Sequence, residues 1–433
     1  MGELTFVSYL PLILLFIFFF LRIPVAFSLL LTSMIYFFFI NTAMPVDLAL
    51  QNLISGLESF PLLAIPFFIT AGVVMNYSGL SKRIMEFADL LVGHMTGGLG
   101  QVTVIMSTIM GGASGSSNAE TAMQCKMLVP EMRKRGYSLP FCAAVTATSS
   151  IIPALIPPGI VMIIYAMVAR VSVGKMFMAG FVPGLILATT LMITVYLVSK
   201  KEGYGKSRDK MASPKEILKG AMDALLALFM PFGIIMGLRF GLFTPTEGGA
   251  IAVVYCMAVG MFVYKGIKLK DIVPIMQESF TSTAEVVFII VGANIFGLYL
   301  SWERIPHQLS QLLLGLTTSP FVFLLVINVF FLILGMFIEA GPAIIILVPL
   351  LIAPLNALHI DLIHFGIIIT LNLVIGGITP PFGSMMFIAC QILKVPINAF
   401  ARANLPFLIT SMLVLALITY VPWIVMVLPN MFK

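Results

Sequence analysis

Long apolar stretches, separated by short polar segments, make up most of this chain. Most of them reach the length of about 20 residues that a helix needs to cross the hydrocarbon core of a bilayer. A helix that is apolar on every face is surrounded by lipid or by other apolar helices, so we expect an all-α membrane protein with several crossings. The stretches lie at about residues 4–21, 24–40, 61–76, 87–110, 139–169, 178–199, 220–238, 246–264, 284–300, 320–338, 343–358, 362–390 and 403–428.

The interruptions of the apolar pattern occur twice along the chain, at a separation of 223 residues. The dipeptide Pro157-Pro158 matches Pro380-Pro381 at this separation. Paired Gly/Pro interruptions in two apolar halves are the best sequence indicator of the binding site of a secondary transporter. We therefore predict an internal duplication. Its parts are a first repeat at 1–199, a cytoplasmic linker at 200–219 and a second repeat at 220–433.

Four stretches cannot be simple membrane spans. Two are too long for one span and hold Pro-Pro in their middles, where proline removes a backbone donor and clashes with the preceding turn. The other two have a polar centre rich in small residues or proline, so each is predicted to enter the membrane and return. The sequence thus predicts two re-entrant helical hairpins and two broken helices. The hairpins are expected at about 100–130 and 320–358, and the broken helices at about 139–169 and 362–390.

Lysine and arginine residues predict the orientation of the chain. With the N-terminus outside and one hairpin entering from each side, most basic residues face the cytoplasm, as the positive-inside rule requires. Five crossings then separate equivalent points of the two repeats, so the second repeat is inverted. The first apolar stretch carries Glu3 in place of a basic leader and is expected to be a span, not a signal peptide. The basic residues predicted to lie outside are Arg170, Lys175, Arg239, Arg304 and Lys433.

Two segments mix polar and apolar residues at near-helical spacing, at 43–60 and 266–282. Such segments suit helices that lie in the membrane interface, where they would brace a fixed scaffold. Glu285 falls close to the second of them and is expected near the end of a span, at the interface.

Composition excludes several classes of function. Only 10% of the residues are charged, against roughly 25% in soluble domains, so the solvent of this chain is lipid. The net charge of +6 is explained by the cytoplasmic loops, and no nucleic-acid partner is expected. The sequence holds no Walker loop, no metal-ligand spacing and no catalytic constellation. We therefore expect no enzyme, no cofactor and no transition metal.

The segment 111–121, Gly-Gly-Ala-Ser-Gly-Ser-Ser-Asn-Ala-Glu-Thr, is the most polar of the interruptions. Such a loop survives in a bilayer core only against protein or a water-filled cavity. Glycines let carbonyl groups turn outward, and hydroxyl and amide side chains add the neutral oxygens that suit a monovalent cation. The helix that restarts near Asn118 points its positive end at an anion. This loop can therefore contact both a sodium ion and a carboxylate, although tight packing of small residues between helices is the alternative.

The other interruptions supply the remaining candidates. The second hairpin tip, Glu339 to Pro342, places a carboxylate where it needs a partner or water. Glu120 and Glu339 are candidate proton sites, or caps of the helices that begin there. The predicted sodium-binding residues are Gly112, Ser114, Ser116, Ser117, Asn118, Ser149, Ser150, Pro157, Glu339, Gly341, Asn372, Gly376, Gly377 and Thr379. The predicted substrate-binding residues are Ser116, Asn118, Pro158, Gly159, Pro342, Thr379 and Pro381.

Three motifs carry a resemblance to a known family: Gly-Gly-Ala-Ser-Gly-Ser-Ser-Asn-Ala-Glu, Ile-Pro-Pro-Gly and Gly-Gly-Ile-Thr-Pro-Pro-Phe-Gly. With them the chain resembles, over essentially its whole length, the large membrane subunit of TRAP transporters, the tripartite ATP-independent periplasmic transporters of bacteria. The resemblance implies a sodium-driven importer of organic acids in the bacterial inner membrane. It also implies an elevator mechanism, in which the hairpins and broken helices form a transport domain that moves against a scaffold.

The resemblance further implies partners and a pairing of sites. A small membrane (Q) subunit would brace the scaffold, and a periplasmic binding protein would deliver the substrate. We expect the small subunit to be a separate chain, because no extra four-span segment precedes the duplication. Carried onto this sequence, the ion sites pair Ser114 to Asn118 with the break at 149–158, and Glu339 to Pro342 with the break at 372–381.

The function expected from these observations is sodium-coupled import of a small organic acid anion, of the sialic acid or C4-dicarboxylate class. One alternative is a proton-coupled organic anion transporter that works without a binding protein, and another is a channel. Replacing sodium by choline at constant pH separates the two coupling ions. Saturable uptake to above the outside concentration would exclude the channel.

Overall fold

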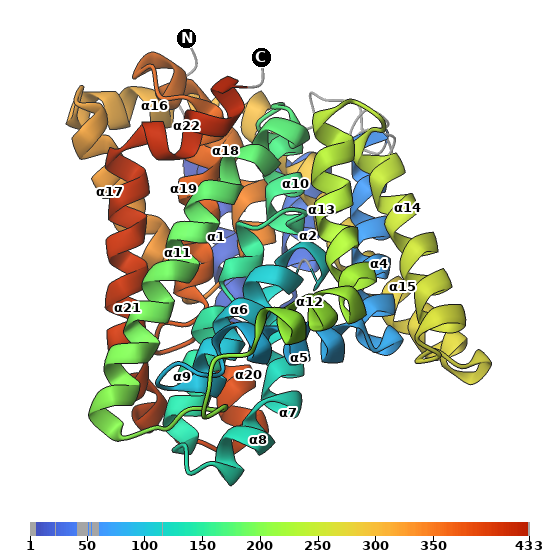
Figure 1. Cartoon of the computed structure of the whole chain (residues 1–433). Coiled ribbons are helices and arrows are strands. Elements are labelled where there is room, and N and C mark those ends of the chain that lie inside the picture. Colours follow the sequence, from blue (N-terminus) through green and yellow to red (C-terminus); the bar gives the residue numbers. More distant parts are fainter. Residues whose placement is uncertain are drawn as a thin grey trace.

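The computed structural model describes residues 6–21, 23–40, 51, 53, 60–114 and 116–431, and within these ranges the chain is helical and holds no β-strand (Figure 1). The predicted all-α class is therefore confirmed. The first half holds α1 (Phe6–Phe20), α2 (Val25–Ile35), η1 (Tyr36–Ile40), η2 (Phe60–Leu63), α4 (Ala64–Ser78), α5 (Leu80–Val92), α6 (Gly98–Ser114), α7 (Ser117–Met127), α8 (Val129–Lys134), α9 (Leu139–Ser149), η3 (Ile152–Ala154), α10 (Ile160–Val168) and α11 (Val173–Glu202). The second half holds α12 (Pro214–Asp223), α13 (Leu225–Arg239), α14 (Pro245–Ala258), η4 (Val259–Val263), η5 (Leu269–Asp271), α15 (Ile272–Trp302), α16 (Ile305–Leu316), α17 (Pro320–Gly335), α18 (Ala340–Ala357), α19 (Leu362–Gly376), α20 (Ser384–Leu393), α21 (Ile397–Tyr420) and α22 (Pro422–Met431).

The two halves match element by element at the separation seen in the sequence. The π-helical turns η1 and η4 begin 223 residues apart, and so do α7 and α18. The caps match as well: the Ser138 hydroxyl accepts a hydrogen bond from the first turn of α9, and the Asp361 carboxylate does the same for α19. Shared caps and helical defects at one separation support a duplication, whose boundaries at 199 and 220 remain predictions.

Equivalent helices run in opposite directions through the bundle. In Figure 1, α11 descends from the end that holds α16 and α22, whereas α21, which packs beside it, ascends toward that end. The hairpin of α6 and α7 enters from the lower end, and the hairpin of α17 and α18 enters from the upper end. The predicted inversion requires this opposite direction.

Both Pro-Pro stretches are broken helices, as predicted. The first break separates α9 from α10 and the second separates α19 from α20. The first helix of each hairpin packs against one break. A Cβ atom on Gly111 would lie 2.9 Å from Cβ of Ile156, and one on Gly376 would lie 2.4 Å from the carbonyl carbon of Gly335. At the second contact backbone meets backbone, so only glycine fits there.

The expectation of a separate interfacial helix at 266–282 is wrong. Most of this segment belongs to α15, a continuous helix of 31 residues that continues through the following span. Its one proline, Pro274, lies in the first turn, where a missing backbone donor costs little, so nothing ends the helix before Trp302. The other segment, 43–60, lies almost entirely outside the described residues.

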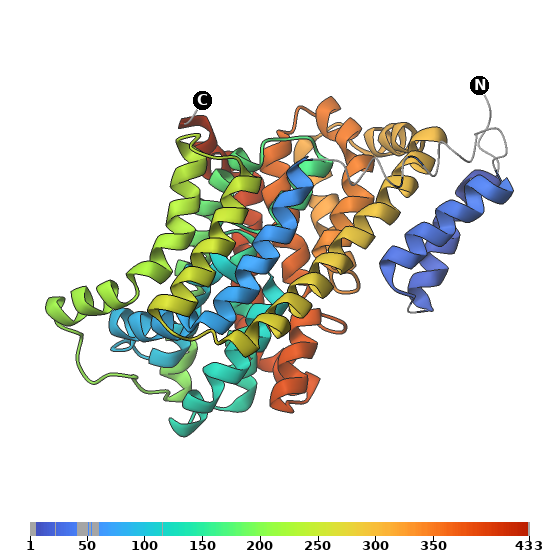
Figure 2. The ribbon, with the colours of Figure 1, turned by 90° about the vertical axis from the view of Figure 1, so that its right-hand side faces the viewer.

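By length and composition, five described helices are long and apolar enough to cross a membrane, or up to seven if each of two bent pairs is one span. The bent pairs are α4 with α5, at 72°, and α12 with α13, at 70°. Figure 2 shows α12 extending sideways from the lower end of α13. The fold thus combines steep helices with two short helices that lie across their lower ends.

Candidate functional site

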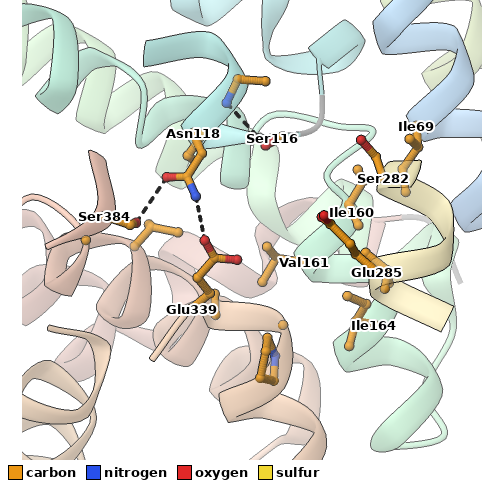
Figure 3. Close-up of a pocket in the computed structure, with 18 of the residues that line it drawn as sticks. Ile69, Ser116, Asn118, Ile160, Val161, Ile164, Ser282, Glu285, Glu339 and Ser384 are labelled. Carbon is orange, nitrogen blue, oxygen red and sulfur yellow. Dashed lines mark hydrogen bonds between the residues drawn. The ribbon is translucent and has the colours of Figure 1, made fainter. Parts of the chain in front are cut away.

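A cavity of about 360 Å³ lies where the two hairpin tips meet (Figure 3). The starts of α7 and α18 form one side of it, together with α20, and α10 also contributes to the lining. Helices α4 and α15 line the opposite side. Apolar side chains such as Ile69, Ile160 and Ile164 separate the polar groups, so a small number of oxygen and nitrogen atoms define what can bind.

The start of α7 brings the first hairpin tip to the cavity. Ser116 is the N-cap residue, and its hydroxyl accepts a hydrogen bond of 3.4 Å from the backbone N–H of Ala119. Ser116, Ser117 and Asn118 all line the cavity. The free N–H groups and the positive end of the helix dipole therefore lie beside the cavity, as the sequence predicted for an anion site.

Asn118 connects the two hairpins and one broken helix. Its side-chain N–H donates to the Glu339 carboxylate at 2.7 Å, and its side-chain oxygen accepts from the hydroxyl of Ser384 at 3.0 Å (Figure 3). Glu339 occupies the N-cap position of α18, but its carboxylate accepts from the other hairpin and caps no backbone group of the described first turn. Glu339 was predicted to be either a proton site or a helix cap, and the structure does not support the helix cap.

Glu120, the other candidate proton site, lies in the first turn of α7 and is fully buried. It accepts a hydrogen bond of 2.5 Å from the side-chain amide of Gln124, which also donates to Ser107 at 2.6 Å. Glu120 is therefore part of a buried polar network inside hairpin 1 and does not line the cavity.

The cavity collects only part of the predicted site. Of the predicted residues, Ser116, Ser117, Asn118, Glu339, Gly341, Pro342 and Gly377 line it. The predicted residues that do not line it are Ser149, Ser150, Pro157, Pro158, Gly159, Asn372, Gly376, Thr379 and Pro381. Gly112 and Ser114 lie in the last turn of α6, and their side-chain surroundings fall outside the described part.

Hydroxyl groups at the breaks donate to their own helices. The side-chain oxygens of Ser149, Ser150 and Thr379 each donate to the carbonyl four residues earlier, at 2.7 to 2.8 Å. Asn372 donates to the carbonyl and side-chain oxygens of Asn328 in α17, at 2.9 and 2.7 Å, and so joins the second hairpin to α19. The ligand roles assigned to these residues remain predictions.

Sequence reasoning missed the contribution of α15. Glu278, Ser282 and Glu285 line the cavity from one face of this helix, at the spacing of one and two turns. Glu285 was expected near a span end, but α15 begins at Ile272, so this residue lies near the middle of the helix. Two carboxylates seven residues apart in an apolar helix were the available signal.

The lining of the cavity is acidic. It includes the carboxyl groups of Glu278, Glu285 and Glu339, whereas the described lining residues include no lysine, arginine or histidine. All three residues are exposed at the cavity, and carboxylates in this position attract cations and repel anions. The charge of the side chains therefore favours a cation here, and the helix start at Ser116 is the feature that favours an anion.

Comparison with known proteins decides the family. Residues 12–424 match the family described as "Tripartite ATP-independent periplasmic transporter, DctM component". The chain belongs to this family. It is similar to the sialic acid TRAP transporter large permease protein SiaM of Vibrio cholerae, with 36% identity over 413 residues, which cover 95% of this chain and 96% of the relative. It is also similar to the C4-dicarboxylate TRAP transporter large permease protein DctM of Rhodobacter capsulatus, with 36% identity over 94% of this chain and 95% of the relative.

A solved structure matches the fold as well. The crystal structure of the Alcanivorax borkumensis YdaH transporter aligns with a TM-score of 0.65 and 15% sequence identity, over 96% of this chain and 98% of that chain. At this identity the match shows a shared fold alone. The family membership confirms the predicted resemblance. This TRAP permease is therefore a multi-pass transport protein of the bacterial inner membrane and not an enzyme.

Proposed function

We propose that this TRAP permease imports a small organic acid anion together with sodium ions. The names of its relatives, which concern sialic acid and C4-dicarboxylates, support a carboxylate substrate of one of these classes. The position of the cavity between two hairpin tips and two broken helices fits a substrate site at the interface of inverted repeats.

The observation that carries the sodium proposal is the acidic lining. An anion that enters a cavity with three carboxyl groups, and with no basic side chain among its described lining residues, meets repulsion. Burying an unpaired anion in a medium of low dielectric is also costly. Sodium ions beside Ser116, Asn118 and Glu339 would offset both costs, and the hydroxyl and amide oxygens there are suitable ligands. Cation and anion would then bind together, and transport of the anion would be coupled to transport of sodium.

The same arrangement supports an elevator movement, which is part of the proposal. The hairpins and broken helices would form the moving domain, and α4 and α15 across the cavity would belong to the scaffold. The bends of 72° and 70° at α5 and α12 supply short connecting helices that can change direction without unfolding a span. The substrate would stay in the cavity while the moving domain carries it past α15.

The proposal includes two partners. The family description names one component of a tripartite transporter, which supports a small membrane (Q) subunit and a soluble binding protein in the periplasm. The binding protein would deliver the organic acid and carry much of the selectivity, because the cavity itself offers few groups that distinguish one carboxylate from another.

Uptake into proteoliposomes tests the proposal. Vesicles holding this chain and its small subunit would receive an inward sodium gradient and radiolabelled sialic acid or a C4-dicarboxylate, with and without matching binding proteins. Accumulation that needs both sodium and a binding protein is the expected result. Sodium-dependent accumulation without a binding protein would keep the ion site and reject the tripartite mechanism.

A proton-coupled transporter without a binding protein is the second candidate, and the fully buried Glu120 favours it. Replacing sodium by choline at constant pH, with an inward proton gradient, discriminates the two. Uptake that persists in choline and is lost in Glu120→Gln would assign the coupling to protons. Uptake that stops in choline would reject this candidate.

A further inference from the structure

Helix α12 is amphipathic and projects from the molecule. It starts with a capping box in which Ser213 and Glu216 exchange hydrogen bonds, and these bonds lower the pKa of the Glu216 carboxyl. None of its ten residues is buried. Leu218 and Met222, one turn apart, have exposed fractions of 64% and 66%. A helix with an uncovered apolar face, set at 70° to the next span, has the geometry of a helix that lies in a membrane surface.

Positive charge gathers beside this helix, in the segment that leads into it, whereas α12 itself balances Lys215 and Lys219 with Glu216 and Asp223. The segment 200–219 holds seven basic and three acidic residues, a net charge of +4 within a chain whose total is +6. Lys215 and Lys219 are exposed and lie one turn apart on α12, beside the apolar face that Leu218 and Met222 form. Lysine side chains at the border of an apolar face reach outward to the headgroups while their methylene groups stay in the apolar layer.

The opposite side of α12 is fixed to the protein. A Cβ atom on Gly220 would lie 2.2 Å from Cδ1 of Leu90, so the two short helices α12 and α5 pack closely. Helix α5 leads through the turn at 93–97 into hairpin 1. The linker holds this turn, because the backbone N–H groups of Ser207 and Arg208 both donate to the carbonyl of Gly93. One side of α12 thus faces the protein and the other side is left for a different partner.

We propose that α12 is a surface anchor for anionic phospholipids, placed in the leaflet on the linker side of the membrane. Leu218 and Met222 lie among the acyl chains, and Lys215 and Lys219 contact the phosphate groups of the lipids. The charge of the segment 200–219 and the amphipathic face select this occupant, because a membrane surface rich in anionic lipid offers both an apolar layer and negative charge. Through α5 this anchor holds the base of hairpin 1 at the membrane surface.

Fluorescence at Met222→Cys tests the anchor without a transport assay. The described native cysteines (Cys125, Cys142, Cys256 and Cys390) are buried, so an environment-sensitive dye reacts mainly at position 222, and unmodified protein corrects for background. The full chain is placed in vesicles of pure phosphatidylcholine, or of phosphatidylcholine with one third phosphatidylglycerol, and quenching by nitroxide-labelled acyl chains is measured. We expect strong quenching on the anionic vesicles, weaker quenching on the neutral ones, and a difference that shrinks in high salt.

Two lysine variants separate specific headgroup contact from general charge. Each lysine near an anionic surface raises the ratio of membrane-inserted to free α12 by about fivefold. The double variant Lys215→Gln with Lys219→Gln therefore lowers this ratio on anionic vesicles by about 30-fold. Lys268→Gln with Lys270→Gln removes the same charge from another exposed turn at the same end and leaves the ratio unchanged. Equal quenching on both lipids, an equal loss in both double variants, or no quenching at all would each overturn the proposal.

Discussion

At the scale of single residues, Asn118 is the side chain on which the candidate site depends most. Its two amide atoms join the first hairpin, the second hairpin and α20, through Glu339 and Ser384. The bond to Glu339 involves a carboxylate, and hydrogen bonds to charged groups contribute more than neutral ones. An amide that makes both bonds keeps the hairpin tips together and presents an oxygen at the cavity.

Asn118→Ala is expected to lower sodium-dependent uptake without unfolding the protein. Loss of a hydrogen bond to a charged group costs about 1.5–3 kcal/mol, which corresponds to at least a tenfold lower uptake rate at limiting sodium. The measurement is the initial rate of uptake against sodium concentration, with the thermal unfolding temperature recorded in parallel. Ser384→Ala is the matched control, because it keeps the bond to Glu339 and should have a smaller effect. Normal sodium dependence in Asn118→Ala would count against this site.

At the scale of elements, the breaks could be predicted from the sequence, whereas the full length of α15 could not. Pro-Pro and Gly-Gly act locally, because proline removes a donor and clashes with its own preceding turn, so the ends of α9 and α19 follow from nearby residues alone. The continuity of α15 depends on the absence of a stop signal over 31 residues. The lysines at 268 and 270 made the segment 266–282 look like a separate interfacial helix, but the segment runs into the single long helix α15.

In the candidate site too, the residues marked by local sequence signals were predicted, and the residues placed by long-range packing were missed. The starts of α7 and α18 were found because helix starts have local signals in serine, asparagine and proline. Glu278 and Glu285 were missed as cavity residues because their position depends on which face of α15 packs toward the hairpins. That face is fixed by contacts between segments far apart in the chain, which one sequence does not reveal.

The linker after α11 is an element whose strength can be tested. Tyr204 stacks on Tyr137 with ring centroids 4.6 Å apart, and its hydroxyl donates to the Ser138 side chain at 2.8 Å and accepts from the Ser138 backbone N–H at 3.3 Å. Each hydrogen bond contributes about 1 kcal/mol and the ring pair a similar amount. These contacts hold the linker against the start of α9.

Tyr204→Ala should therefore loosen the linker, and Tyr204→Phe should do so less, because the phenyl ring keeps the stacking. We expect trypsin to cut after Lys206 or Arg208 about 150-fold faster in Tyr204→Ala, which loses about 3 kcal/mol, and about 30-fold faster in Tyr204→Phe, which loses about 2 kcal/mol, since cleavage tracks the population of the open form. The rates are measured by limited proteolysis in detergent. Equal rates in all three proteins would show that the linker is held by other contacts.

At the scale of the whole molecule, the distribution of charge agrees with the predicted orientation. The linker, α8 and the turn between η4 and α15 lie at one end of the bundle, and α16 and α22 lie at the other (Figure 1). The first end carries most of the basic residues, so the positive-inside rule places it in the cytoplasm.

Single cysteines test this orientation. Lys175 at the start of α11 and Lys210 in the linker are both exposed and lie at opposite ends of the molecule. A membrane-impermeant maleimide should label Lys175→Cys in intact cells, whereas Lys210→Cys should react only in inverted vesicles. Mass spectrometry of the purified protein reads the result, and the reverse pattern would overturn the orientation.

The acidic cavity has an electrical consequence under the proposed sodium coupling. Each elementary charge that crosses a membrane potential of 100 mV gains or loses about 2.3 kcal/mol, a factor of about 50 in the concentration ratio. Under that proposal, a described lining that brings Glu278, Glu285 and Glu339 and no basic side chain would favour enough sodium to outweigh the charge of the anion. The loaded complex would then be net positive relative to its empty form, and a voltage negative inside would draw the cargo inward. Import would respond to voltage as well as to the sodium gradient, and a potassium diffusion potential across the vesicle membrane would change its rate.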